Sequence, residues 1–282
     1  MKNNRLLKRI TALVCALVLL VSCFAGCGFG DDKVYRTYEE IKEAGKVRIG
    51  VYSDNNPFSF ANENGDYQGY EINFANQLAK KMGVKAKFVS TEADDRAKYL
   101  ETGKVDIVIA SYAIEKTAKK LVDFAKPYMK TSLAAVASDK EKIASLNDLE
   151  KKDRVIVVSG SAAASYMTEN YPDVNLVECG SENEAIDALE NNKGVLWLGD
   201  NIKVAEFAYQ NDGFSLVINE LGDTVKYAPA VSKGNSTLEK KINKIIKKLT
   251  KEDFFTADYN ETLKNVYGED FAQSLIIDST SK

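Results

Sequence analysis

The feature that most constrains the fold is a regular alternation of short apolar segments with helical segments along the first half of the chain. The predicted strands cover residues 46–51, 84–89 and 105–110, and the predicted helices between them cover residues 69–82 and 94–101. In the first of these helices the apolar residues recur at helical spacing, and Gly83 follows directly as a stop signal. Strands that alternate with helices of this length predict a parallel sheet covered by helices, which is an α/β fold.

The alternation begins again at residue 133. Further strands are predicted at residues 133–137, 154–158, 175–178, 194–198, 214–218 and 227–232, and further helices at residues 145–151, 162–171, 183–190 and 200–210. No linker rich in serine or glycine divides the chain. If the chain forms two lobes, crossing strands must therefore join them in place of a flexible tether.

The C-terminal region is predicted to be helical. Leu238, Ile242, Ile245 and Leu249 fall on one face of a helix, and many lysines fall on the opposite face. A lysine-rich face of this kind is either a solvated surface or a docking surface.

The N-terminal residues predict export from the cytoplasm. Four basic residues precede an apolar run over residues 10–21, which is short for a membrane span and typical of a secretory signal. Cys23 and Cys27 both follow small residues in the pattern of a lipoprotein signal. The pattern favours residues 1–26 as the signal peptide and Cys27 as the lipidated residue, with Cys23 as the alternative lipidation site. A second alternative is an ordinary secretory signal in which both cysteines are incidental. A diacylated cysteine would hold the protein on the outer face of the bacterial cell membrane.

Composition excludes several classes of function. The chain has 38 basic and 41 acidic residues. Removal of residues 1–26 takes away four basic residues, which leaves a net charge of about −7 and argues against nucleic acid or an anionic lipid surface as a partner. There is no histidine, and Cys179 would be the one thiol besides the anchor. Disulfide frameworks, histidine-based catalysis and cysteine- or histidine-rich metal sites are thereby excluded, and we expect no metal and no cofactor.

Several short motifs, in their order and spacing, resemble a known family. They are Gly50–Phe58 (GVYSDNNPF), Gly69–Asn73 (GYEIN), Gly103–Asp106 (GKVD), Val122–Phe124 with Pro127-Tyr128, Gly160-Ser161-Ala162, and the ending from Glu252 to Tyr267. Each motif alone is weak, but together they resemble the extracellular solute-binding proteins of family 3, the amino-acid receptors of bacterial ABC importers. The likeness covers nearly all of residues 46–270.

The resemblance implies a fold of the periplasmic-binding-protein type II kind, in which two α/β lobes are joined by two crossing hinge strands. Lobe 1 would comprise residues 34–132 plus 229–282, and lobe 2 residues 133–228. Hinge closure of such lobes around a ligand absorbs backbone changes at a few positions. The implied partners are a small-molecule ligand and an ABC transporter permease, and the implied state is a lipid-anchored monomer.

The resemblance also indicates residues for the ligand's charged groups. Asp200 falls where the family places the partner of the ligand's ammonium, at the carboxyl end of a predicted strand, although capping of the next helix would also explain an Asp there. Gly160 and Ser161 lead into a helix N-terminus, where free N–H groups favour an anion. Arg96 could pair with a carboxylate through both of its terminal nitrogens, or could form a surface salt bridge with a neighbouring aspartate.

Aromatic and polar residues of the predicted cleft complete the candidate site. Tyr52 and Tyr166 are expected to line it from the two lobes, together with Asn55 and Phe58 of the loop after the first strand. Any single aromatic residue belongs to a core more often than to a ligand site, so the alternative for each ring is core packing.

The chain departs from the family pattern at the carboxylate end of this site. Family members usually carry an arginine at position 118 that holds the ligand's α-carboxylate, but this chain has Ala118, and Asn55 and Ala113 replace a usual lysine and hydroxyl. A charge-assisted hydrogen bond contributes roughly 1.5–3 kcal/mol, so loss of the usual contacts would weaken binding on the order of 10²–10⁴-fold. Either Arg96 and the Gly160 turn hold the carboxylate, or the ligand carries less negative charge. Because Asp200 remains, the pattern favours an amine-bearing ligand.

The sequence therefore predicts a lipid-anchored receptor that delivers an amino acid or a related amine to an ABC importer, without catalysis. The first alternative is an enzyme on the same scaffold, with dehydratase-like chemistry and Glu115 or Asp200 as the acid. A sensor module is the second alternative.

Overall fold

The structure is a computed structural model that describes residues 34–277. The predicted signal peptide at residues 1–26 and the two candidate lipidation sites, Cys23 and Cys27, lie outside the described residues.

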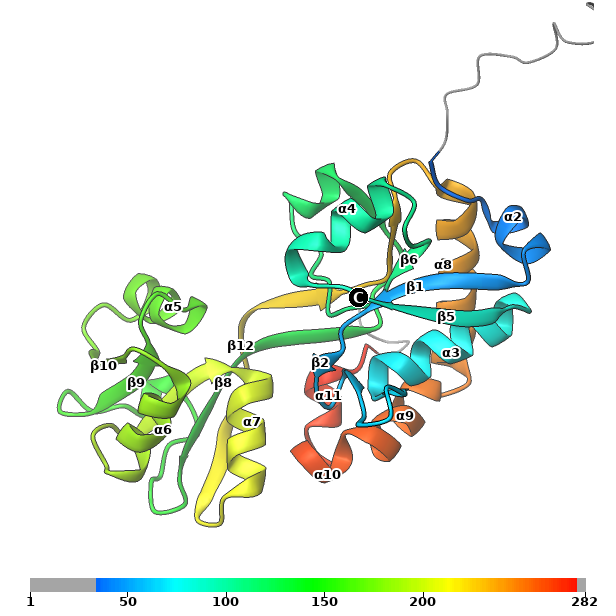
Figure 1. The fold of residues 1–282 in the computed structure, drawn as a ribbon. Coiled ribbons are helices and arrows are strands. Elements are labelled where there is room, and N and C mark those ends of the chain that lie inside the picture. Colours follow the sequence, from blue (N-terminus) through cyan, green and yellow to red (C-terminus); the bar gives the residue numbers. More distant parts are fainter. Residues whose placement is uncertain (1–33, 278–282) are drawn as a thin grey trace, which may run out of the picture. The chain divides into compact units, whose positions relative to one another are not determined.

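The first of two five-stranded sheets has the strand order β5-β1-β6-β13-β7. Its parallel part consists of β5 (Lys85–Ser90), β1 (Lys46–Val51) and β6 (Ile107–Val108), while β13 (Ala230–Ser232) runs antiparallel to β6 and to β7 (Val122–Phe124). The helices associated with it in Figure 1 include α2 (Tyr38–Glu43), α3 (Tyr70–Met82), α4 (Arg96–Glu101) and α8 (Ser236–Lys251). The predicted parallel α/β arrangement is confirmed for this part of the chain.

The second five-stranded sheet has the order β10-β9-β11-β8-β12. Its parallel strands are β10 (Asn175–Cys179), β9 (Arg154–Val158) and β11 (Leu196–Asp200), and its antiparallel strands are β8 (Met129–Ser138) and β12 (Phe214–Tyr227). Helices α5 (Ala162–Asn170), α6 (Glu182–Glu190) and α7 (Asn201–Gln210) connect these strands. A small third sheet, β2 (Asp54–Asn55), β3 (Ser59–Ala61) and β4 (Tyr67–Gln68), follows β1.

Several predicted elements differ in length from those observed. The strand expected at residues 105–110 is reduced to the two residues of β6, and the helix expected at residues 145–151 is a single 3-10 turn, Leu146–Asp148. The helix is limited to this turn because Ser145 and Asp148 cap each other across it, and the backbone of Leu149 is extended again. The strand expected at residues 214–218 extends to fourteen residues in β12, whose mostly polar second half does not alternate clearly.

The chain passes between the two large sheets twice, from β7 to β8 and back from β12 to β13. The two passages lie side by side: the amide of Tyr128 donates to the carbonyl of Tyr227 at 3.0 Å, and the amide of Ala125 donates to the carbonyl of Pro229 at 2.8 Å. Strand β12 pairs with β8 from Phe214 to Tyr227, but with register shifts between Leu216 and Val225.

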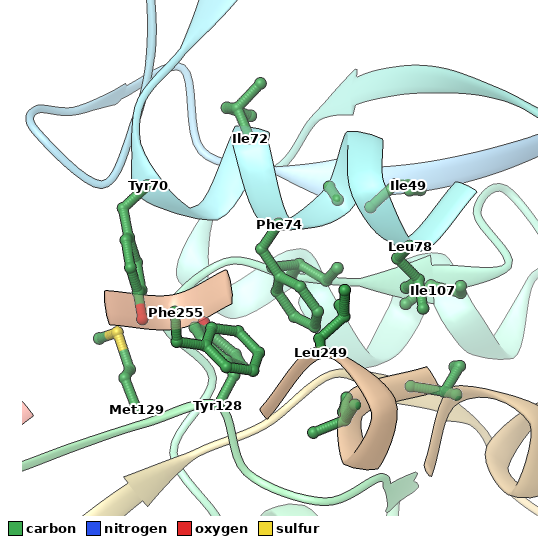
Figure 2. Packing of buried hydrophobic residues seen from close by; sticks show 14 of the residues in the cluster. Ile49, Tyr70, Ile72, Phe74, Leu78, Ile107, Tyr128, Met129, Leu249 and Phe255 are labelled. Atoms are coloured by element: carbon green, nitrogen blue, oxygen red, sulfur yellow. The ribbon is translucent and has the colours of Figure 1, made fainter. Parts of the chain in front are cut away.

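The largest hydrophobic cluster joins α3 to the C-terminal helices. Phe74 of α3 packs against Tyr128 at a ring-centroid distance of 5.0 Å and against Phe255 at 5.3 Å, as Figure 2 shows. Phe255 belongs to α9 (Phe254–Thr262), and the shorter helices α10 (Lys264–Tyr267) and α11 (Ala272–Leu275) complete the chain. Burial of a large apolar side chain stabilises a fold by about 1.5–3 kcal/mol, so these contacts hold the end of the chain on the first sheet.

Asp106, at the end of the Gly103–Asp106 motif, is a buried carboxylate shared by two arginines. Arg36 binds it with Nε and Nη2, and the Nη2 of Arg48 donates to its Oδ1 at 2.6 Å. Burial alone would raise the pKa of Asp106, but the hydrogen bonds from the two arginines outweigh burial and hold the pKa below its usual value. The motif therefore has a structural role, tying the chain before α2 to β1.

Asp258 of α9 is a buried carboxyl without a cation. Only 3% of the residue is exposed. The Nδ2 of Asn73 in α3 donates to its Oδ1 at 2.9 Å, while its Oδ2 has no hydrogen-bond partner. Burial raises the pKa of Asp258 to about 8, because the surroundings disfavour the charged form.

We expect Asp258 to make the fold less stable as pH rises from about 4 to about 8. The unfolded carboxyl ionises near its ordinary pKa of about 3.9, whereas the folded one keeps its proton to about pH 8, so ionisation of the unfolded state costs stability across that interval. The Asp258→Asn variant mimics the protonated side chain. Its melting temperature should exceed that of the unsubstituted protein by a margin that grows between pH 5 and pH 8.

Asp173→Asn, at an exposed position, provides the control and should follow the unsubstituted protein at every pH. If Asp258→Asn and the unsubstituted protein showed parallel melting profiles from pH 5 to pH 9, the buried carboxyl would not have a raised pKa.

Candidate functional site

A pocket of about 340 Å³ lies among residues of the second large sheet, of helices α6, α7 and α10, of the loop after β1 and of the segment after β6. Its wall is formed by Asn55, Asn56, Phe58, Ser111, Met129, Glu182, Asp200, Ile202, Lys203, Glu206, Tyr227 and Tyr267. The volume lies within the range of small-molecule sites, roughly 300–1,000 Å³. Its position at the carboxyl end of β11 agrees with the usual place of ligands in open α/β sheets.

Ser111 forms one side of this pocket and has a left-handed backbone, with φ of 42°. Its amide donates to Oε1 of Glu71 at 2.7 Å, and its hydroxyl donates to the same oxygen at 3.1 Å. The Nδ2 of Asn55 in turn donates to the hydroxyl oxygen of Ser111 at 3.2 Å. Glu71 therefore orients Ser111, and Ser111 orients Asn55 at the pocket wall.

Glu71 is fully buried in the first turn of α3. Tyr128 also donates to its Oε1, while its Oε2 has no hydrogen-bond partner. Burial raises the pKa of Glu71, and the hydrogen bonds from Tyr128 and Ser111 offset part of that rise. One carboxylate oxygen thus holds three donors from two distant segments of the chain.

Arg96 lies directly behind Ser111. Its Nε donates to the carbonyl of Ala93 at 2.9 Å, and its Nη1 donates to the carbonyls of Ala110 and Ser111, each at 3.1 Å. Its guanidinium lies over the ring of Tyr112, 4.2 Å from the centroid, and 5.9 Å from the centroid of Tyr52. Within the described chain Arg96 therefore binds backbone carbonyls and forms no salt bridge with Asp94 or Asp95.

Asp200 is the last residue of β11 and the N-cap of α7, where its Oδ1 accepts from the amide of Ile202 at 3.0 Å. Both proposed roles are compatible, because capping uses one carboxylate oxygen and leaves the other. Although the residue is exposed, the surrounding protein partly desolvates the carboxyl and raises its pKa, and nearby Glu182 acts in the same direction.

Three carboxylates and one ammonium face the same pocket. The carboxylates belong to Glu182, Asp200 and Glu206, and the ammonium belongs to Lys203. Lys203 lies 3.9 Å from Glu182, and both side chains are about half exposed, so this pair is weak. The pocket wall is therefore acidic on the side of α6 and α7.

Three of the eight predicted ligand-binding residues line this pocket: Asn55, Phe58 and Asp200. Phe58 is 4% exposed and also belongs to the main core. Tyr52 and Arg96 lie one layer back, around Tyr112. Among the described residues Gly160, Ser161 and Tyr166 lie elsewhere than on this wall, so their assignment to the site stays a prediction.

The Gly160 turn and Tyr166 have local structural roles. Gly160 has φ of 71°, and Ser161 caps α5 by accepting from the amide of Ala164 at 3.1 Å. The ring of Tyr166 packs near Tyr171 and against Gly222 of β12, where an added Cβ would approach the ring to 3.2 Å.

Sequence reasoning missed most of the polar wall. Ser111 carried no signal, because its left-handed backbone and its bond to Glu71 depend on tertiary structure. Glu182, Lys203 and Glu206 each look like ordinary charges on helix surfaces. Lys203 and Glu206 could have been anticipated from the sequence. They lie three and six positions after Asp200, on the first turns of the helix that Asp200 begins.

A model of the bacterial extracellular solute-binding proteins, family 3, matches residues 47–263. The chain belongs to this family.

Characterised family members share the full length of the fold with it. The ABC transporter glutamine-binding protein GlnH of Bacillus subtilis is 28% identical over 256 residues, which cover 88% of this chain and 93% of the relative. The solute receptor for L-cysteine of Neisseria gonorrhoeae is 36% identical, with a TM-score of 0.60 over 86% of this chain and 100% of that one. The cysteine-binding protein of Campylobacter jejuni is 35% identical, with a TM-score of 0.59 over 86% of this chain and 99% of that one. The predicted type II binding-protein fold is thereby confirmed.

Within residues 34–277 no helix has the length and apolar character needed to cross a membrane.

Ala118 occupies the family position at which the resemblance implies a carboxylate-binding arginine. It lies in a 3-10 turn, is 8% exposed and belongs to one hydrophobic cluster with Tyr112. Arg96 lies over the same Tyr112 ring. The missing arginine is therefore replaced by apolar packing, and a different guanidinium lies near that packing.

We expect Ser111→Gly to be more stable than Ser111→Ala by about 1 kcal/mol. Both variants lose the hydroxyl and its bonds to Glu71 and Asn55, but only glycine adopts the left-handed backbone without a steric cost. The flexibility of glycine in the unfolded chain offsets part of this gain. Urea unfolding at neutral pH measures the difference.

The matched pair is Ser165→Gly and Ser165→Ala, at an exposed position inside α5. In a right-handed helix alanine is favoured by roughly 1 kcal/mol, so the order of stability should reverse. The same order at both positions would contradict the left-handed geometry of Ser111.

Proposed function

We propose that the protein is a lipid-anchored receptor that binds an amino acid in the pocket around Asp200 and delivers it to an ABC importer. The acidic wall is the observation that carries this proposal. Glu182, Asp200 and Glu206 outnumber Lys203, and a ligand ammonium placed among them gains charge-assisted hydrogen bonds.

Cysteine is the first candidate ligand. Two structural relatives at 36% and 35% identity are named as receptors for L-cysteine and for cysteine, and a curated relative is named as a glutamine-binding protein of an ABC transporter. These names support an α-amino acid over a simple amine, which modifies the preference that Ala118 suggested.

Arg96 is the proposed partner of the ligand's carboxylate. Its Nη1 is held by two backbone carbonyls next to the pocket, and these carbonyls are neutral acceptors. Its Nη2 makes no hydrogen bond within the described chain, so this group is available to an anion. Gly160 and Ser161, with Tyr52 and Tyr166, would complete the site when the lobes close.

We propose residues 34–132 plus 229–282 as lobe 1 and residues 133–228 as lobe 2. Sheet membership supports this division, because β12 and β8 belong to the second sheet and β13 and β7 to the first, although β8 begins four residues before the proposed boundary. A ligand that touches both lobes favours the closed state, which the transporter would recognise. The proposed anchor is Cys27, with Cys23 as the alternative.

We expect Asp200→Asn to weaken cysteine binding by about 10- to 100-fold. The substitution removes one charge-assisted bond, worth roughly 1.5–3 kcal/mol, while asparagine caps a helix as well as aspartate does. The melting temperature of the free protein should therefore change little. Isothermal titration calorimetry with cysteine, under reducing conditions, measures the affinity.

Asp212→Asn, an exposed position shortly after α7, changes the net charge by the same amount and should bind as the unsubstituted protein does. Equal loss of affinity in the two variants would mean that Asp200 acts only through net charge.

We further expect Arg96→Ala to remove the preference for an amino acid over its decarboxylated amine. The unsubstituted protein should be stabilised against heating more by cysteine than by cysteamine, because only cysteine carries the carboxylate. In Arg96→Ala the two ligands should have similar, small effects, and Arg154→Ala, an exposed position, should keep the preference. Stronger stabilisation by cysteamine than by cysteine would identify an amine receptor, and recovery of chemically altered ligand would favour the enzyme alternative.

A further inference from the structure

The outer face of α8 carries a stripe of four exposed lysines. These are Lys240, Lys244, Lys247 and Lys251. The spacings of four, seven and eleven residues from the first to the others place all four on one side of an α-helix. None of them forms an ion pair with another described residue, whereas Lys248 beside them pairs with Glu252 at 3.7 Å.

The orientation of this lysine stripe is fixed by the opposite side of the helix. Leu238, Ile242 and Leu249 are fully buried in the main core, half a turn around the helix from the stripe. The helix cannot rotate without exposing them, so the four ammonium groups stay directed away from the protein. Like charges four residues apart destabilise a helix slightly, and no acidic side chain of the described residues compensates the stripe.

We propose that the lysine stripe binds the phosphate headgroups of anionic lipids in the membrane that carries the protein. The inference rests on the proposed lipid anchor. The two acyl chains of that anchor already hold the protein on the membrane, and α8 would add an electrostatic contact with the lipid surface.

The start of α8 lies where the described chain begins. The hydroxyl of Tyr35 donates to the carbonyl of Gly234 at 3.3 Å, and the Nδ2 of Asn235, the N-cap of α8, donates to the carbonyl of Arg36 at 2.9 Å. Figure 1 shows α8 and α2 at this point.

The anchor position limits the distance of α8 from the bilayer. Tyr35 is eight positions after Cys27, so even a fully extended chain spans at most about 28 Å. Helix α8 has 16 residues and is therefore about 24 Å long. An anchor at Cys27 thus keeps the start of α8 within about 28 Å of the lipid surface and its far end within about 52 Å, whatever the conformation of the connecting residues.

The acidic net charge of the chain does not prevent this contact. Charges separated by more than the Debye length of about 8 Å at physiological ionic strength are largely screened. The headgroups would therefore respond to the four lysines that face them more than to carboxylates on other surfaces. Each lysine near an anionic surface strengthens binding by about fivefold.

Vesicle co-sedimentation of the mature chain, residues 27–282 with Cys27→Ser to remove the lipid, tests the proposal. Vesicles contain phosphatidylcholine alone or equal amounts of phosphatidylcholine and phosphatidylglycerol. The unsubstituted mature chain should sediment with the anionic vesicles only, and high salt should release it. Substitution of all four lysines by glutamine, which keeps helix propensity, should lower the partition coefficient by about tenfold or more.

The control replaces four exposed lysines elsewhere by glutamine. They are Lys140, Lys142, Lys151 and Lys193. This variant has the same net charge as the stripe variant and should bind anionic vesicles within about twofold of the unsubstituted chain. Absence of binding to anionic vesicles, or equal loss in the two variants, would overturn the proposal.

Failure of the inference can be told apart from failure of the proposed function. Both lysine variants leave the pocket and Cys27 of the full-length protein unchanged. Cysteine binding by titration and lipidation of Cys27 by mass spectrometry therefore report on the receptor and its anchor, while vesicle binding reports on the stripe alone.

Discussion

One buried carboxylate oxygen connects the pocket to the rest of the fold. Oε1 of Glu71 accepts from the amide and hydroxyl of Ser111 and from the hydroxyl of Tyr128. These donors come from the segment after β6 and from the last residue before β8, whereas Glu71 itself belongs to α3. Because a buried polar group without partners is costly, the three segments are constrained together, and the position of the pocket wall follows from the position of α3.

The architecture could be predicted from the sequence because its signals are local. Helical periodicity in α3 and the strand–helix alternation require no knowledge of distant residues, and the motifs that resemble the family lie within a few residues each. The candidate site could be predicted less completely from the sequence. Asp200 follows a strand and begins a helix, so its place at the sheet edge could be inferred, whereas Ser111 enters the pocket only through its bond to Glu71, forty positions earlier.

The difference between local signals and tertiary contacts also applies to positions 96 and 118. The sequence showed that position 118 lacks a cation, but it did not show that Ala118 packs in the cluster of Tyr112 or that Arg96 lies over that ring. Two consecutive carbonyls, of Ala110 and Ser111, hold Arg96 there. The position of this guanidinium therefore depends on backbone acceptors that only the folded chain brings to it.

The irregular pairing of β12 with β8 has a mechanical consequence. Regular ladder hydrogen bonds resist bending, and they are interrupted by register shifts between Leu216 and Val225. Gly222, with φ of 70°, lies in the same stretch. Fewer regular ladder hydrogen bonds therefore hold β12 to β8 over these residues, which lie beside the ring of Tyr166. We therefore expect any bending of β12 to concentrate in this stretch, between its regularly paired ends.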